Sequence, residues 1–401
     1  MDTSLYIHIP FCRARCSYCD FNTYAGLAGL IPGYIDALCL ELRELGTAAE
    51  AVLQYKLPIG TVYFGGGTPS LLAAPLIGQV LDTVRDVFKL QSGAEISLEA
   101  NPDSTDLKNL KRLPAAGVNR ISLGVQSFDP VELQVLGRIH TAEQTSAAVS
   151  VIREAGFDNL SFDLIYGIPG QTTLSWQASL QQAVRLSPQH LSLYSLTVEE
   201  GTKLQEELAA GRLTEPDPDV MAEMYEQACS FLSVEGYEQY EISNWAKPGK
   251  TQGSSFFPLY ASRHNLQYWR NEPYLGVGAG AAGFAGGFRT LTIAHPAAYI
   301  RAFQKPSQDV FPFSAAVVER EAISRQREIE DTLMMGLRLT GAGVNVNRFI
   351  ERFSTSPQVL YKEEIDLLVS QGLLEQTADS LRLTVKGRLL GNQVFCKFIS
   401  S

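Results

Sequence analysis

Three cysteines with a short, regular spacing lie near the start of the chain. Cys12, Cys16 and Cys19 form the pattern C-x3-C-x2-C in "FCRARCSYCDF". Thiolates this close together can bind zinc or an iron–sulfur cluster, or can be chemically unrelated thiols. Structural zinc takes four ligands, usually as separated pairs, and the sequence offers no second pair. His8 is a further donor nearby, but it lies in a strand pattern, where a hydrogen-bonded core histidine is an equally good interpretation.

The number of cysteines in this loop carries chemical information. A four-iron cluster is normally held by four thiolates. If a protein supplies three, one iron keeps open coordination sites and can bind a substrate directly. The remaining cysteines, Cys39, Cys229 and Cys396, are isolated in the sequence. We interpret them as small buried hydrophobic residues. Six cysteines in 401 residues also form no disulfide framework.

The elements that must position this loop follow an alternating pattern. Apolar β-branched and aromatic runs predict strands at 5–9, 61–66, 95–100, 120–125, 159–167 and 190–196. Helical periodicity appears at 33–46, 75–89, 105–115, 142–155, 173–186 and 218–235. Such units predict a parallel sheet, as an α/β barrel or an open doubly wound sheet. Because the first strand runs into a cysteine loop instead of a Gly-x-Gly phosphate loop, we favour a partial (β/α)6 TIM-like barrel.

Polar residues and glycines are expected where these strands end. The segment "GGGTP" (65–69), Glu99, Gln126 and Asp163 all fall at or just after a predicted strand end. In both α/β architectures this edge carries the active site. The glycines would leave backbone N–H and C=O groups unobstructed for a ligand. Glu99 suits an amine or ribose hydroxyls, and the guanidinium of Arg138 suits a carboxylate.

The chain divides into three parts by pattern. We expect a barrel with the cysteine loop over 1–235, an irregular extension over 236–302, and a winged-helix-like α+β domain over 303–401. The Gly- and Ala-rich run 274–288 is expected to be tightly packed loop and turn. A net charge of −10 argues against a nucleic acid partner, so the last domain is expected to pack against protein instead of binding DNA.

The sequence also predicts a location. It shows no leader of signal type and no run of about 18 apolar residues that a membrane helix needs. We therefore expect a cytoplasmic protein, with peripheral membrane contact and a homodimer both left open.

The cysteine spacing, with the aromatic Tyr18 directly before the third cysteine, resembles the radical S-adenosylmethionine (SAM) superfamily. The resemblance implies a [4Fe-4S] cluster held by Cys12, Cys16 and Cys19. In that superfamily the open iron chelates the amino and carboxylate groups of SAM, and the reduced cluster passes an electron to the SAM sulfonium, which releases a 5′-deoxyadenosyl radical.

Further motifs narrow the resemblance to one branch. The segments "LYIHIPFCRARCSYCDF", "YFGGGTPSLL", "RISLGVQSF", "FDLIYGIPGQT" and "RHNLQYW" are similar to the branch that contains the oxygen-independent coproporphyrinogen III oxidases and the related haem chaperones. The similarity runs over nearly the whole chain. It implies SAM contacts from Tyr6, Tyr18, Gly66, Gly67, Thr68, Glu99, Gln126, Arg138 and Asp163.

Two departures separate the oxidases from this chain. The oxidases resemble C-x3-C-x2-C-x-C, with a further cysteine two positions after the third, whereas this chain has Phe21 there. They also carry an N-terminal extension, for which the eleven residues before Cys12 leave no room. A true oxidase that decarboxylates coproporphyrinogen III is therefore the second hypothesis.

The segment "HNLQYW" (264–269) instead fits the H-N-x-x-Y-W pattern of the haem chaperones. A neutral imidazole is a good axial ligand for haem iron, so the resemblance implies that His264 binds haem beside Tyr268 and Trp269. Without the resemblance, the sequence would indicate that His264 is a structural histidine. We expect a chaperone that binds haem and passes it to an acceptor protein, with exchangeable SAM at the cluster. A metal-stabilised scaffold that makes no use of SAM is the third hypothesis.

Overall fold

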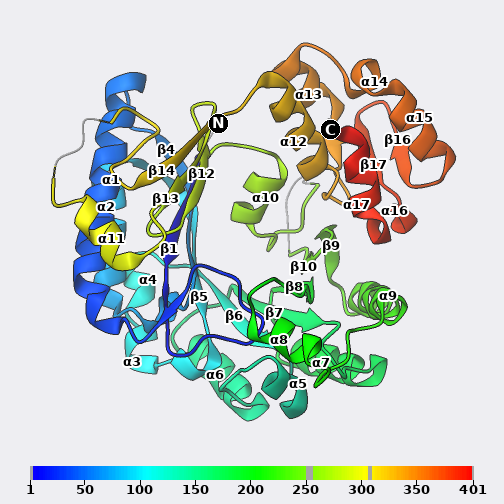
Figure 1. Ribbon diagram of the computed structural model, residues 1–401, viewed down its shortest axis with the longest axis horizontal. Helices are drawn as coiled ribbons and strands as arrows, with labels where there is room; N and C mark the ends of the chain where they lie inside the picture. The colour runs from blue at the N-terminus through cyan, green and yellow to red at the C-terminus, as the bar shows by residue number, and fades with distance from the viewer. Residues whose placement is uncertain (1–2, 250–255, 306–308, 400–401) are drawn as a thin grey trace. The chain divides into compact units, whose positions relative to one another are not determined.

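We analysed a computed structural model of the chain, which describes residues 3–249, 256–305 and 309–399 (Figure 1). By contacts the chain forms two compact units. Unit 1 comprises residues 1–228 and 273–322, and unit 2 comprises residues 229–272 and 323–401. The segment expected as one extension, 236–302, is thus divided between the two units at Pro273. None of the described helices is long and apolar enough to cross a membrane.

Unit 1 is built on the predicted parallel strands. Consecutive strands pair in parallel in chain order: β1 (Thr3–Ile9), β4 (Pro58–Gly66), β5 (Lys89–Ala100), β6 (Arg120–Gln126), β7 (Leu160–Tyr166) and β8 (His190–Ser195). Their pairing confirms the six expected strands. Two short strands, β2 (Phe11–Cys12) and β3 (Tyr24–Ala25), pair with each other across the cysteine loop.

Helices α1 to α7 lie between these strands in the chain, on the outer side of the sheet, and α8 and α9 follow β8 (Figure 1). Their bounds are α1 (Ile31–Leu53), α2 (Ala74–Val87), α3 (Leu107–Leu110), α4 (Leu113–Ala116), α5 (Pro130–Val135), α6 (Ala142–Glu154), α7 (Thr173–Arg185), α8 (Lys203–Ala209) and α9 (Pro218–Val234). Several begin at side-chain caps; the Thr141 and Gln144 side chains form a capping box on α6, for example. Helix α1 buries Ile35, Leu38 and Leu42, which recur three or four residues apart on one face. The architecture is a partial β/α barrel, as expected.

The Gly- and Ala-rich run after residue 272 forms strands, so the expectation of loop and turn was wrong. Strand β11 (Tyr274–Val277) pairs in parallel with β1, and β12 (Ala282–Ala285), β13 (Phe288–Thr292) and β14 (Val317–Ala322) extend the sheet in antiparallel order. Glycine permits this because β11 and β12 approach closely: a Cβ on Gly276 would lie 1.8 Å from the Ala282 carbonyl oxygen. Helix α11 (Pro296–Ala302) follows β13.

Unit 2 combines short strands with a small helical domain. Its elements before residue 272 are β9 (Glu238–Glu241), β10 (Asn244–Ala246) and α10 (Arg263–Trp269). After residue 323 come α12 (Arg325–Gly336), β15 (Val344–Asn345), α13 (Val346–Phe353), α14 (Pro357–Leu360), α15 (Lys362–Ser370), β16 (Leu374–Gln376), β17 (Ser380–Leu383), α16 (Val385–Leu389) and α17 (Gly391–Phe395). The antiparallel sheet β15-β17-β16 and its helices enclose a core that includes Leu337, Phe349 and Leu381. A C-terminal domain was expected, but its expected start at 303 differs from the structure, in which residues up to Ala322 belong to unit 1.

A buried carboxylate joins the first helix of unit 1 to α11 and to the loops next to β11 and β14. Glu41 of α1 is fully buried, and its Oε2 accepts hydrogen bonds from the Gly278 N–H (2.7 Å) and the Tyr299 hydroxyl (2.5 Å). Its Oε1 accepts one from the Ser314 hydroxyl (2.6 Å). Burial raises the pKa of Glu41 to about 7, although these hydrogen bonds oppose the shift.

This pKa predicts a pH-dependent stability. Because Glu41 binds its proton more tightly in the folded chain, its stabilising contribution is fully present below about pH 4.5 and is lost as the pH rises to about 7. The isosteric E41Q variant removes this titration. We expect the free energy of unfolding of the wild type to fall, relative to that of E41Q, by up to about 3 kcal/mol between pH 5 and pH 8. Urea unfolding followed by circular dichroism measures it; parallel pH profiles of the two proteins would contradict the assignment.

Candidate functional site

The cysteine loop leaves the carboxyl end of β1 and is tied to the barrel at several points. The Tyr24 N–H donates to the Pro10 carbonyl (2.7 Å), which closes the loop. Inside the loop, the Ser17 N–H and hydroxyl donate to the carbonyls of Leu136 (3.0 Å) and Val135 (2.6 Å). The Ser17 carbonyl accepts from the Leu204 N–H (2.8 Å). The loop is thus fixed between Cys16 and Tyr18, even though it has little regular structure of its own.

The three thiols share one environment. Cys12, Cys16 and Cys19 are each partly buried and free of disulfides. Burial raises the pKa of Cys12 and of Cys16, and the other two cysteines raise the pKa of Cys12 further, since neighbouring thiolates repel one another. The Arg138 guanidinium opposes the shift at Cys16. A cation near these sulfurs favours their thiolate forms, which are the forms that bind metal.

The donor set is suited to an iron–sulfur cluster. Thiolates are the usual ligands of a four-iron cluster, and the three thiols lie near enough to influence one another electrostatically. Three neighbouring thiols on one fixed loop agree with such a cluster. Ligation of a cluster by Cys12, Cys16 and Cys19 stays a prediction.

The glycine segment packs directly against the start of the cysteine loop. The Gly67 N–H donates to the Ile9 carbonyl (2.9 Å), and the Thr68 N–H donates to the Phe11 carbonyl (2.8 Å). The Gly66 N–H donates to Glu99 Oε2 (3.1 Å). These N–H groups are therefore engaged within the protein, contrary to the expectation that they are unobstructed. A Cβ on Gly67 would lie 2.7 Å from the Phe11 carbonyl oxygen, so glycine is needed there for close approach.

Two carboxylates lie inside the barrel. Glu99 of β5 accepts from the Tyr63 hydroxyl (2.8 Å), and Asp163 of β7 accepts from the Ser122 hydroxyl (3.1 Å to Oδ2). Burial raises the pKa of Glu99 to about 7, and the charge of Asp163 contributes to the shift. Burial also raises the pKa of Asp163. Glu99 therefore changes charge near neutral pH, which suits a group that binds an amine or hydroxyl ligand.

Asp163 differs from its expected placement at a strand end, whereas Gln126 lies where it was expected. Asp163 lies in the middle of β7, paired with Gly124 and Ser192, so the expectation that it sits at the strand tip was wrong. Gln126 does end β6, and it is buried with a φ of 64°. A non-glycine residue in the left-handed region carries backbone strain, which is common at ligand sites.

Aromatic residues complete the site on two sides. The Tyr6 hydroxyl on β1 lies 3.0 Å from His8 Nδ1, and its ring stacks beside that of Tyr63 at 6.3 Å between centroids. The Tyr18 hydroxyl accepts a hydrogen bond from Arg138 Nη2 (2.5 Å). Burial raises the pKa of Tyr18 to about 12, and therefore Tyr18 stays neutral. Arg138 thus contacts the cysteine loop through Tyr18, the residue directly before Cys19.

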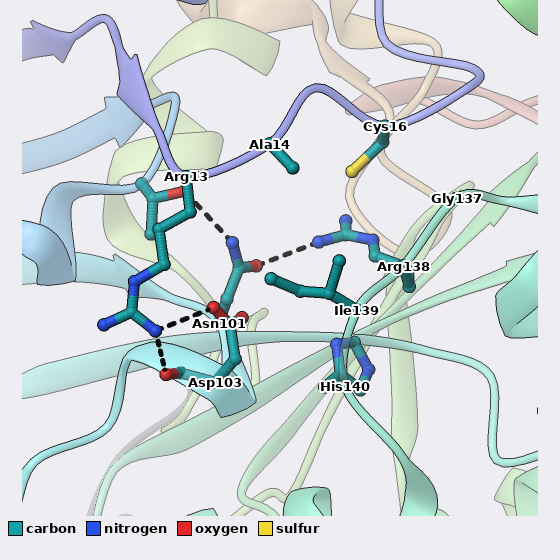
Figure 2. A pocket seen from close by; sticks show the side chains of 10 residues that line it. Arg13, Ala14, Cys16, Asn101, Asp103, Gly137, Arg138, Ile139 and His140 are labelled. Atoms are coloured by element: carbon teal, nitrogen blue, oxygen red, sulfur yellow. Dashed lines mark hydrogen bonds and ion pairs between the residues drawn. The ribbon is translucent and has the colours of Figure 1, made fainter. Parts of the chain in front are cut away.

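Asn101 was not singled out from the sequence, although it occupies the centre of this site. Figure 2 shows it in a small pocket lined also by Cys16, Thr68, Arg138 and His140. Asn101 follows β5 directly and precedes Pro102. The signal that identified Glu99, a polar residue at a strand end, applies equally to Asn101. An asparagine before proline also fits an ordinary turn, so its residue type alone does not mark it as a site residue.

The predicted haem ligand lies in unit 2, in a different environment. His264 is in α10 and is buried, and its Nε2 lies 3.0 Å from the Tyr268 hydroxyl, with the two rings edge to face. Around α10 an apolar cluster contains partly buried aromatic side chains, Phe257, Tyr260 and Trp269. In this conformation His264 does not present Nε2 to solvent. Iron ligation at that nitrogen requires the bond to Tyr268 to be replaced.

Comparisons with known proteins agree with this geometry. The family model of the radical SAM superfamily matches residues 6–183, and the model of the HemN C-terminal domain matches residues 323–390. The solved structure of coproporphyrinogen III oxidase (HemN) from Escherichia coli, a radical SAM enzyme, superimposes with a TM-score of 0.80 at 24% identity, over 99% of this chain and 90% of that one. At this identity the structural likeness establishes the fold alone.

Curated relatives match over the full length. The heme chaperone HemW of Bacillus subtilis is 38% identical over 397 residues, covering 99% of each chain. HemW of Escherichia coli K12 is 35% identical, covering 99% of this chain and 98% of the relative. The mitochondrial radical S-adenosyl methionine domain-containing protein 1 of Bos taurus is 34% identical, covering 99% and 87%. The chain belongs to the radical SAM superfamily and, within it, to the family of the HemW proteins.

The contact of Gly67 with the cysteine loop yields a prediction. G67A places a Cβ against two backbone carbonyls, which we expect to destabilise unit 1 by about 1–3 kcal/mol. At roughly 2–4 °C per kcal/mol, the thermal midpoint falls by several degrees. G29A is the matched control, because a Cβ there meets no atom within 4 Å and Gly29 has no left-handed φ. Equal thermal midpoints for G67A and the wild type would show that this packing does not hold the loop.

Proposed function

We propose that this protein is a haem chaperone that binds haem and transfers it to an acceptor protein. The observation that carries the proposal is the full-length similarity, at 35–38% identity, to proteins named heme chaperone HemW. Both units take part in that similarity, because the alignments cover 99% of this chain. The acceptor is identified only by its chemistry, as a protein that receives haem.

The cofactor part of the proposal concerns unit 1. Cys12, Cys16 and Cys19 would hold a [4Fe-4S] cluster, and the partly buried thiols near the Arg138 charge support this assignment. When bound, the cluster supplies one-electron chemistry and an open iron for the amino and carboxylate groups of SAM. The site around the loop would hold exchangeable SAM through Tyr6, Tyr18, Gly66, Gly67, Thr68, Glu99, Gln126, Arg138 and Asp163.

The chain's own groups suit different parts of such a ligand. Glu99 offers a carboxylate acceptor to an amine or to ribose hydroxyls, and it is held by Tyr63 and by the Gly66 N–H. Arg138 offers a planar fork to a carboxylate. The two lie on different segments, β5 and the loop after α5, around one set of thiols. Opposite charges at separate points can orient a zwitterionic amino acid group.

Phe21 supports the chaperone over the oxidase. In the oxidases a cysteine stands two positions after the third ligand, whereas here the side chain is an exposed phenylalanine, with 63% of its surface accessible. An exposed aromatic ring cannot supply a thiolate there. The full-length similarity in the HemW family points in the same direction.

One experiment separates these functions. A single anaerobic preparation with reconstituted cluster, SAM and a reductant is divided and given haem or coproporphyrinogen III. We expect stable co-elution of haem with the protein and no protoporphyrinogen IX, with C16A as the cluster-free control. Formation of protoporphyrinogen IX by the wild type but not by C16A would establish the oxidase instead.

The haem ligand is tested by freeing or removing His264. We expect H264A to weaken haem binding by about tenfold or more, because an axial ligand is lost. Y268F removes the hydroxyl next to Nε2, so it should bind haem at least as tightly as the wild type. H295A is the control, because His295 is exposed and caps α11. Haem titration followed by absorbance decides; an unchanged spectrum for H264A, with weakened binding in H295A, would move the ligand to His295.

A further inference from the structure

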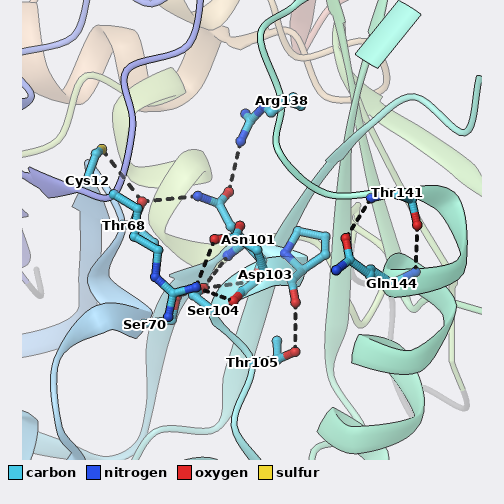
Figure 3. Close-up of polar contacts among 12 residues, drawn as sticks. Cys12, Thr68, Ser70, Asn101, Asp103, Ser104, Thr105, Arg138, Thr141 and Gln144 are labelled. Atoms are coloured by element: carbon cyan, nitrogen blue, oxygen red, sulfur yellow. Dashed lines mark hydrogen bonds and ion pairs between the residues drawn. The ribbon is translucent and has the colours of Figure 1, made fainter. Parts of the chain in front are cut away.

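Four residues form an unbroken line of hydrogen bonds that ends on a cysteine sulfur. Arg138 Nη1 donates to Asn101 Oδ1 (3.0 Å), and Asn101 Nδ2 donates to Thr68 Oγ1 (3.0 Å). The Thr68 hydroxyl in turn donates to Cys12 Sγ (3.6 Å). Figure 3 shows the four side chains in sequence, and Figure 2 shows how Asn101 lies beside Arg138 in the pocket.

The direction of every bond in this line is fixed by its first member. A guanidinium can only donate, so the amide oxygen of Asn101 must face Arg138 and its NH₂ group must face Thr68. The Thr68 oxygen then accepts from Asn101, which leaves its own proton for Cys12. Bonds aligned in this way polarise one another, and a charged donor at one end strengthens the others.

The surroundings hold Asn101 in this orientation. Its N–H donates to Ser104 Oγ (3.1 Å), and Ser104 shares a hydrogen bond with buried Ser70 (2.6 Å). On the opposite side β6 comes close, because a Cβ on Gly124 would lie 2.9 Å from Asn101 Oδ1. Thr68 is itself buried and fixed by its N–H bond to the Phe11 carbonyl. The amide therefore has little freedom to turn.

We propose that Asn101 is a positioning residue that links Arg138 to Cys12 and so sets the reduction potential of the bound cluster. Hydrogen bonds to cluster sulfurs stabilise the reduced state, which carries more negative charge, and raise the potential. A bond whose donor is polarised by a cation does so more strongly. Any ligand that binds Arg138 changes this polarisation. Ligand binding at Arg138 therefore also changes the reduction potential of the cluster.

The inference rests on the cluster part of the proposed function and is independent of haem. Its test uses the full chain with reconstituted cluster, and the readout is the midpoint potential from an anaerobic dye-mediated titration followed by electron paramagnetic resonance. Iron content is measured first. A wild type that loads no iron refutes the proposed cofactor, whereas fully loaded variants with unchanged potentials refute only the present inference.

N101D is the most informative variant. It keeps the shape and the contact with Arg138, but its second carboxylate oxygen accepts where the amide donated. The Thr68 hydroxyl then turns towards residue 101 and no longer donates to Cys12. We expect N101D and T68V to shift the midpoint potential in the same negative direction, and T68S to retain the wild-type value. T105V, which removes a hydroxyl bonded only within the same loop, is the matched control and should not shift it.

The double variant shows whether Asn101 changes the potential through Thr68 or independently of it. If Asn101 acts through Thr68, N101D combined with T68V shifts the potential no further than T68V alone. Additive shifts would overturn the proposal, and so would a shift in T68V with none in N101D. If N101D does not load iron, G124A tests the same point, because its methyl group presses against Asn101 Oδ1. Unshifted potentials in both single variants, G124A and T68V, would overturn the proposal.

Discussion

The main constraint on unit 1 is that three thiols must be held together on a loop that has almost no regular structure. Such a loop has no helix or strand ladder to satisfy its backbone, so its shape must come from bonds to neighbouring segments. Ser17 provides them on one side, through Leu136, Val135 and Leu204. The glycine segment provides them on the other side, through Gly67 and Thr68. The barrel thus places these hydrogen-bonding residues around the cysteine loop.

The same constraint explains the polar interior behind the loop. Glu99, Asp163 and Arg138 are charged groups that a folded protein normally keeps at its surface. Here the Tyr63 and Ser122 hydroxyls donate hydrogen bonds to Glu99 and Asp163, and Arg138 donates one to the Tyr18 hydroxyl. The cost of burying charge is expressed in the raised pKa of Glu99, about 7. A ligand that pairs with these groups would recover part of that cost, so the interior is prepared for a polar, charged molecule.

The elements that could be predicted were those with a local periodic pattern of apolar residues. The six parallel strands and most helices between them lie near their expected positions, because alternating apolar runs and helical stripes are properties of short segments. The bounds are less exact: β5 begins at Lys89, α1 extends to Leu53, and the helix expected over 105–115 forms the two short helices α3 and α4. The cysteine loop and "GGGTP" were also located from spacing and position. Strands β11 to β13 were missed because their glycines serve close approach between strands, which only the partner strand reveals. Asp163 was assigned to a strand end although the predicted strand, 159–167, already places it mid-strand, which β7 (Leu160–Tyr166) confirms.

The relations among distant residues could not be predicted in the same way. Glu41 lies in an ordinary amphipathic helix pattern, and nothing local indicates that Gly278, Tyr299 and Ser314 surround it. Asn101 resembles a turn residue until Arg138 and Thr68 are placed beside it. These contacts span tens to hundreds of positions, and they decide the charge states of the site. Family resemblance suggested the candidate site residues, and the structure adds how they are connected.

The central claim is that three thiols hold a four-iron cluster with one iron left open. Mössbauer spectroscopy of the anaerobically reconstituted protein, with and without SAM, tests it most directly. We predict about four irons per chain, with one distinct iron whose signal changes when SAM is added. Four irons that stay equivalent and unaffected by SAM, or a chain that takes up zinc and no iron, would contradict the account.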